Sequence, residues 1–264
     1  MHSRMTVSVT TSTLALALLA FGCGGATPEK TASPAATPAP EPLVQIDQAT
    51  AATISGTIRF DGQAPKPTVI KMNADPTCAK SHTGPTVLET LLVNDGKVQN
   101  VLVYVKAGVK GKYAPPSTPV VLDQKGCQYS PHVFGVMVGQ PLEVVNSDPT
   151  LHNIHAMPRI NREFNQGQPS PGMSFRHTFS TGEVLVPIKC DVHGWMSAQG
   201  AVLEHPFFAV SGKDGSFTIT GLPAGTYTLE AVHEVLGAQT LELTVTAKEA
   251  RTADFSFKPA QPAS

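Results

Sequence analysis

The chain has 264 residues, of which 41% are hydrophobic and 15% charged, and its formal net charge is −1. This length suffices for one large or two ordinary domains, each with its own core. A nearly neutral chain offers no basic surface, so nucleic acid is not expected as a partner. The 23 prolines, 22 glycines and scarce aromatic residues are typical of many short strands joined by turns, and they predict an all-β fold.

Residues 1–22 are predicted to be a signal peptide. Arg4 supplies a positive end, and residues 14–21 form an apolar core that is too short to span a bilayer. This core ends at Cys23 and two glycines, which resembles the lipobox of bacterial lipoproteins with Cys23 as the acylated residue. The resemblance implies a lipid anchor that holds the protein to the membrane, in the periplasm, at the outer membrane or at the cell surface. Cleavage near Ala20 or Ala26, giving a soluble periplasmic or secreted protein, is the alternative.

Residues 23–52 are rich in Ala, Thr and Pro without apolar periodicity, which predicts a disordered tether. Residues 53–117 are β-rich. Within them, residues 86–93 and 98–105 flank an Asn-Asp-Gly turn and predict a long hairpin. Residues 259–264 are predicted to be a disordered tail.

Two further local predictions concern later strands. Residues 174–179 and 183–189 alternate on either side of a short turn and predict a second hairpin. His233 and Glu234 fall at the end of an expected strand, where they could cap an edge or line an interface; solvated polar side chains are the favoured expectation.

Residues 206–258 have a separate pattern, carried by Asp214-Gly-Ser-Phe-Thr-Ile-Thr-Gly-Leu-Pro-Ala-Gly-Thr-Tyr227. This run resembles the carboxypeptidase-regulatory-like, transthyretin-type β-sandwich, and the resemblance covers about 50 residues. It implies a second β-sandwich but no chemistry. The strands of residues 53–117 are candidates for the first strands of that sandwich, which would make the segment between them an insertion.

The chemistry concentrates in Cys190-Asp-Val-His193-Gly-Trp-Met196, directly after the predicted strand 183–189. A thiolate, an imidazole and a thioether within seven residues, with His152-Asn153 upstream, make up the ligand set of a blue-copper electron-transfer site. A soft thiolate favours copper over harder ions. Zinc also accepts Cys and His, but a Met thioether adds little for zinc.

Residues 118–205 resemble the cupredoxins, with the C-x2-H-x2-M spacing of amicyanin and with plastocyanin also close. The resemblance implies a Greek-key β-sandwich holding one type-1 copper ion on His152, Cys190, His193 and Met196. It gives Asn153 the role of tying the loop of the first ligand to the segment around Cys190.

His155 is the alternative ligand, three residues from His152. Side chains two apart on a strand share a face and those three apart do not, so only one of the two imidazoles is expected to face the metal. With Cys190 a ligand and Cys23 acylated, Cys78 and Cys127 are left as a possible disulfide. A second metal site using these cysteines with His82 and His132 is the less favoured reading, because the spacings match no common zinc site.

The leading functional hypothesis is an extracytoplasmic one-electron carrier, not an enzyme, whose partners are redox proteins of the cell envelope. A copper-binding or copper-delivery lipoprotein without an electron-transfer role is the second hypothesis. A structural cell-surface β-sandwich protein is the third. No nucleophile triad, paired carboxylates or phosphate-binding loop favours a hydrolytic function.

Overall fold

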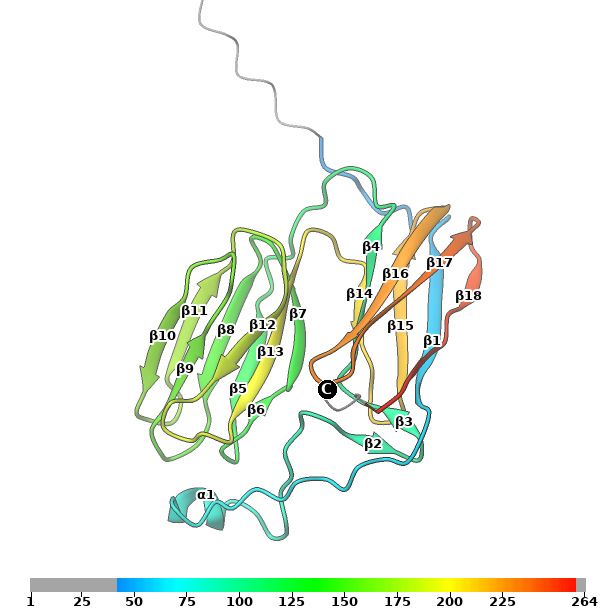
Figure 1. Cartoon of the computed structure of the whole chain (residues 1–264). Helices are drawn as coiled ribbons and strands as arrows, with labels where there is room; N and C mark the ends of the chain where they lie inside the picture. Colours follow the sequence, from blue (N-terminus) through cyan, green and yellow to red (C-terminus); the bar gives the residue numbers. More distant parts are fainter. Residues whose placement is uncertain (1–41, 260–264) are drawn as a thin grey trace, which may run out of the picture. The chain divides into compact units, whose positions relative to one another are not determined.

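Strands dominate the computed structural model, which describes residues 42–259 (Figure 1). In that range the structure has a single α-helix, α1 (Pro76–Lys80), and no helix there is long and apolar enough to cross a membrane. The strands form four sheets that pack around apolar cores, which confirms the predicted all-β, β-sandwich class. The predicted signal peptide, Cys23, most of the tether and residues 260–264 lie outside the described residues.

One sandwich, called here the flanking sandwich, is built from both ends of the described chain. Buried residues of its two sheets share one apolar cluster that includes Ile54, Val103 and Leu229. Its first sheet contains β1 (Ala52–Phe60), β2 (Val93–Asn94), β3 (Lys97–Val98), β15 (Ser216–Leu222), β18 (Ala250–Thr252) and β19 (Phe255–Phe257). Its second sheet contains β4 (Leu102–Ala107), β14 (Phe208–Val210), β16 (Gly225–His233) and β17 (Gly237–Val245).

The other sandwich, called here the inserted sandwich, is formed by the chain between β4 and β14. Its core includes Leu122, Val144 and Ile188. One sheet has the order β10 (Phe164–Gln168), β9 (His152–Ala156), β12 (Glu183–Lys189), β13 (Ser197–Leu203), β7 (Val133–Met137). The other has the order β11 (Ser174–Thr178), β8 (Pro141–Asn146), β5 (Val120–Gln124), β6 (Tyr129–Ser130).

Regular alternation of side chains explains how these strands cover a core. In β8 every second residue is buried, so one face of the strand packs inward and the other meets its surroundings. β1 is crowded on both edges, because it pairs with β15 on one side and with β18 and β19 on the other. A Cβ at Gly56 would lie 1.8 Å from the carbonyl oxygen of Ala253, so this position in β1 requires glycine.

The strands of the two sandwiches touch through a small apolar cluster and through polar contacts of Glu234. The cluster combines Leu102 and Val232 of the flanking sandwich with Val133, Ala201 and Leu203 of the inserted one. Glu234 binds His132 through one carboxylate oxygen and accepts a hydrogen bond from Gln199 Nε2 at 3.0 Å through the other. The insertion is therefore held by side chains as well as by its two chain connections.

Two predicted strand arrangements are wrong. The turn at Asn94–Gly96 exists, with positive φ at Asp95 and Gly96, but it joins only the short strands β2 and β3. Residues 86–92 contain no strand and make one isolated bridge, Val69 with Val87, because no neighbouring strand runs beside them.

The predicted hairpin of residues 174–179 and 183–189 is also wrong. β11 pairs with β8, whereas β12 pairs with β9 and β13, so the two strands belong to opposite sheets. The chain crosses from one sheet to the other after β11, where Phe179 is buried in the core. Alternation alone identified both strands but not their partners.

His233 is buried, at 2% exposure, which corrects the expected solvated role. Its Nδ1 accepts hydrogen bonds from the N–H groups of Val235 and Leu236, at 3.1 and 3.2 Å. Its Nε2 is buried without a partner. Burial therefore lowers the pKa of His233 from 6.5 to about 4, so the ring is neutral in the folded protein above about pH 4.

This burial predicts a pH-dependent stability component. Between pH 6.5 and about 4 the unfolded chain binds a proton that folded His233 does not, so the free energy of unfolding falls as the pH falls. A shift of this size corresponds to roughly 3 kcal/mol. In His233→Asn, which keeps a hydrogen-bond acceptor, urea unfolding is expected to lose this component. Equal pH slopes in the variant and the wild type would contradict it.

Candidate metal centre

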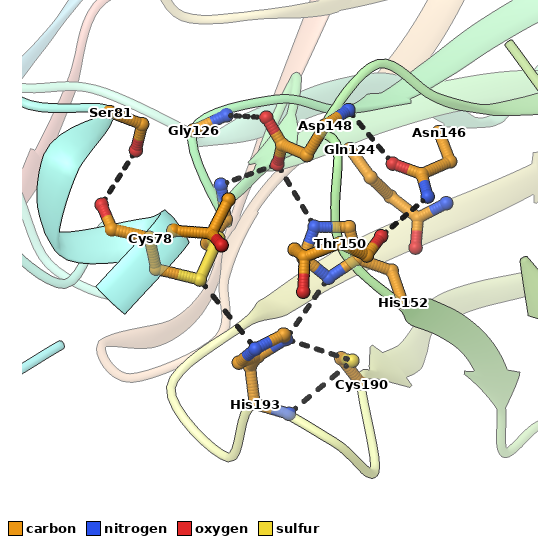
Figure 2. A network of polar contacts seen from close by, with 12 residues as sticks. Cys78, Ser81, Gln124, Gly126, Asn146, Asp148, Thr150, His152, Cys190 and His193 are labelled. Atoms are coloured by element: carbon orange, nitrogen blue, oxygen red, sulfur yellow. Dashed lines mark hydrogen bonds and ion pairs between the residues drawn. A yellow bond between two sulfur atoms is a disulfide. The ribbon is translucent and has the colours of Figure 1, made fainter. Parts of the chain in front are cut away.

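The side chains of His152, Cys190 and His193 meet in the core of the inserted sandwich (Figure 2). His152 begins β9, Cys190 directly follows the neighbouring strand β12, and His193 lies in the turn toward β13. His152 Nδ1 lies 3.0 Å from His193 Nδ1, and Cys190 Sγ lies 3.9 Å from the same His193 nitrogen. One donor atom from each residue lies within 4.8 Å of the other two, close enough for all three to hold one metal ion.

The turn from Cys190 to Met196 is closed by its own backbone. The N–H of Cys190 donates to the carbonyl of Met196 at 3.1 Å, and the N–H of Met196 donates to the carbonyl of His193 at 2.9 Å. The N–H of His193 also points to Cys190 Sγ, at 3.4 Å. Exposures of 0% for His152, 1% for Cys190 and Met196 and 3% for His193 keep the cluster away from water.

Asn153 connects the strand of His152 to the thiol. Its Oδ1 accepts hydrogen bonds from the N–H of Asp191 at 2.8 Å and from Cys190 Sγ at 3.3 Å. Its Nδ2 donates to Asn165 at 2.7 Å and to the carboxylate of Asp191 at 3.1 Å. These contacts fix the position of the sulfur relative to β9.

His155 lies apart from the cluster. Its Nδ1 contacts the carboxylate of Asp191 at 2.9 Å, and its Nε2 contacts Glu163 at 2.7 Å. The hydrogen bond to Glu163 and the one to Asp191 raise the pKa of His155 above its usual value. Both ring nitrogens are thus engaged with carboxylates, and the ring is absent from the donor groups found in residues 42–259.

Each imidazole of the cluster has a carboxylate on its other nitrogen. His152 Nε2 lies 2.9 Å from Asp148 Oδ2, and His193 Nε2 lies 3.0 Å from Asp75 Oδ2. Sequence reasoning missed both acids. Asp148 stands four residues before His152, which is a weak signal, whereas Asp75 is 118 residues from His193 and has none.

These contacts set the charges of the metal-free cluster. Burial would lower the pKa of His152, but hydrogen bonds to Asp148 and Cys190 and the charges of both groups raise it to about 9. Burial would raise the pKa of the Cys190 thiol, but the hydrogen bond with His152 and those with nearby groups lower it to about 7. The hydrogen bond from His193 lowers the pKa of Asp75 to about 2. The neighbouring groups of the cluster thus favour the thiolate form of Cys190.

A disulfide joins Cys78 to Cys127 at the edge of the cluster. Cys78 Sγ lies 3.5 Å from His193 Nε2, and Trp195 Nε1 donates to the carbonyl of Cys127 at 3.0 Å. Because the two sulfurs are bonded to each other, neither offers a thiolate to a second metal. His82 instead contacts the Gly126 carbonyl, at 2.7 Å.

We expect His152 to control ionisation of the thiol. In the metal-free full-length chain, His152→Ala should raise the pKa of Cys190 above about 7, because burial then opposes the thiolate with one partner fewer. Ultraviolet absorbance of the thiolate against pH measures this, with Cys190→Ser as the blank. His155→Ala is the matched control and should leave the titration unchanged. Equal shifts in both variants would show that His155, not His152 alone, acts on the sulfur.

No protein-family model matches the sequence, and no curated protein matches it. Part of the chain is similar to solved copper proteins. A Cu-containing nitrite reductase from Thermus scotoductus SA-01 matches over 39% of this chain and 25% of its own, at 23% identity and a TM-score of 0.32. A Cu(I) structure of an amicyanin mutant matches over 32% and 81%, at 20% identity and 0.29. A purple cupredoxin from Nitrosopumilus maritimus matches over 28% and 81%, at 27% identity and 0.25. With so little of the chain covered, the chemistry of the buried donor cluster is the stronger guide to function.

Proposed function

We propose that this protein is an extracytoplasmic type-1 copper protein that carries single electrons. The observation that carries the proposal is the buried convergence of two imidazole Nδ1 atoms and one cysteine sulfur. Two imidazoles and a thiolate form the trigonal set of blue-copper sites, which a long contact to a methionine sulfur completes. Met196 is buried in the same turn and would supply the thioether sulfur.

The donor chemistry fits copper better than zinc. A thiolate is soft, and a buried thioether in the same turn adds affinity for copper but little for zinc. Both Nδ1 atoms can present a lone pair, because each Nε2 has a carboxylate to which it can donate its hydrogen. When bound there, copper supplies one-electron redox chemistry.

Residues of the chain hold the proposed ligands in fixed positions, as fast electron transfer requires. Two strands of one sheet, β9 and β12, position His152 and Cys190, and the backbone hydrogen bonds of the turn fix His193 and Met196. Asn153 Oδ1 accepts a hydrogen bond from the sulfur of Cys190. Because the donors are fixed and nearly dry, little structure has to rearrange when the charge of the site changes. No substrate turnover is needed.

Copper delivery is the second candidate, since the same donors serve it. A delivery site has to release its ion, however, and the burial of all four proposed ligands, with His193 contacting both Asp75 and Cys78, favours retention. Electron transfer is therefore the preferred function.

The proposal includes the location and partners expected from the sequence. A lipid anchor at Cys23 would hold the protein in the periplasm or at the cell surface, where redox proteins of the cell envelope are its partners. The disulfide of Cys78 and Cys127 supports an oxidising compartment. For the flanking sandwich we keep the transthyretin-type proposal, because the Asp214–Tyr227 run forms its successive strands β15 and β16.

The test is addition of Cu(II) to the full-length chain. A strong visible thiolate-to-copper charge-transfer band is expected, with reversible bleaching on one-electron reduction. The band should disappear in Cys190→Ser and His152→Ala and persist in His155→Ala. A colourless protein that binds only Cu(I) tightly would instead support copper delivery, and a protein without metal uptake would support the structural hypothesis.

A further inference from the structure

The two carboxylates behind the imidazoles are themselves fixed by backbone groups. Asp75 Oδ1 accepts from the N–H groups of Thr77 and Cys78, at 2.7 and 3.3 Å. Asp148 accepts from the N–H groups of Gly126 and Cys127, at 2.8 and 2.7 Å. Neither carboxylate is therefore a mobile surface charge that happens to lie near a histidine.

The disulfide connects these two anchors. Asp75 binds the N–H of Cys78, Asp148 binds the N–H of Cys127, and the two cysteines are bonded to each other. His152 and His193 close the ring through their 3.0 Å contact (Figure 2). Residues 75–81, called here the cap segment, thus contribute one carboxylate and one half of the disulfide to a site whose proposed ligands all lie in the inserted sandwich.

The cap of α1 uses only one of the two oxygens of the Asp75 carboxylate. Oδ1 is the oxygen that satisfies the free N–H groups at the start of the helix. Oδ2 faces the opposite way, 3.0 Å from His193 Nε2 and 3.1 Å from the hydroxyl of Thr150. At 21% exposure the Asp75 side chain is partly shielded from water, and His193 is buried beneath it.

We propose that Asp75 and Asp148 are paired positioning residues that lower the reduction potential of the copper site and strengthen its hold on the divalent ion. This inference rests on the proposed function. Each carboxylate receives the Nε2 hydrogen, which directs Nδ1 toward the metal and makes the imidazole a stronger donor. Each also adds a negative charge close to the ligands, which favours Cu(II) over Cu(I).

The sharpest variant is Asp75→Asn in the full-length chain. Asparagine keeps Oδ1 for the helix cap, so α1 should remain folded, but it puts an NH2 donor where Oδ2 received the hydrogen of His193. Glu163→Gln is the matched control. It removes one carboxylate from a carboxylate–imidazole pair at His155, which lies outside the donor cluster.

For Asp75→Asn we expect Cu(II) affinity to fall about tenfold or more, the usual effect of losing such a partner. Cu(I) affinity should change less. The reduction potential should then rise by about 59 mV for each tenfold difference between the two losses. Asp148→Asn should shift the potential in the same direction, and Glu163→Gln should leave it unchanged. A purely structural role of Asp75 would not move the potential of a folded, copper-loaded variant.

Zn(II) affinity, measured by competition with a chelating dye, separates this inference from the proposed function. If the wild type binds Zn(II) but gives no blue copper band, the electron-carrier proposal fails, and a tenfold loss of Zn(II) affinity in Asp75→Asn still supports the positioning role. A folded Asp75→Asn protein with wild-type potential and wild-type metal affinities would overturn the positioning role alone. A wild-type chain that binds neither metal would overturn both.

Discussion

Two imidazoles and a thiol lie side by side in a place from which water is almost excluded. Polar groups buried in this way are costly unless each one has a partner, and much of the surrounding structure supplies those partners. Asn153 serves the sulfur, Asp148 serves one ring and Asp75 the other. One of these partners is distant in sequence, because Asp75 precedes the whole inserted sandwich.

Segments on both sides of the inserted sandwich in the sequence contact it near the donor cluster. The segment between β1 and β4 belongs to the flanking sandwich at both ends, yet its middle part carries the cap segment to His193. On the other side of the insertion, Glu234 just beyond β16 binds His132, and the Nδ1 of that ring contacts the carbonyl of Ser197, next to Met196, at 3.0 Å. Asp75 therefore contacts His193 directly, whereas Glu234 is connected to the end of the turn only through His132 and Ser197.

The sequence predicted the features that depend on local residue patterns. Alternating residues predicted most strands, and the C-x2-H-x2-M spacing with an upstream His-Asn pointed to His152, Cys190 and His193, which the structure places together. The pairing partners of the strands were harder to predict, as β11 and β12 show. Alternation determines which face of a strand is apolar but not which sheet the strand joins.

The roles of Asp75 and Asp148 could not be predicted from the sequence for a similar reason. Asp75 before Pro76 is a recognisable helix start, but nothing local tells what its second oxygen faces. The residues beside His233 in the sequence likewise gave no sign of its burial.

The disulfide also matters for any attempt to isolate the inserted sandwich. A fragment cut at its natural connections would contain Cys127 but not Cys78, and would leave a second free thiol at the site. Cys127 Sγ lies within 4.8 Å of donor atoms of both Asp148 and His152. The shortened protein would then offer two thiols near the same imidazole, a set of donors that zinc accepts and that the disulfide removes from the complete chain. A piece that keeps the donor cluster with its native partners must therefore include the cap segment.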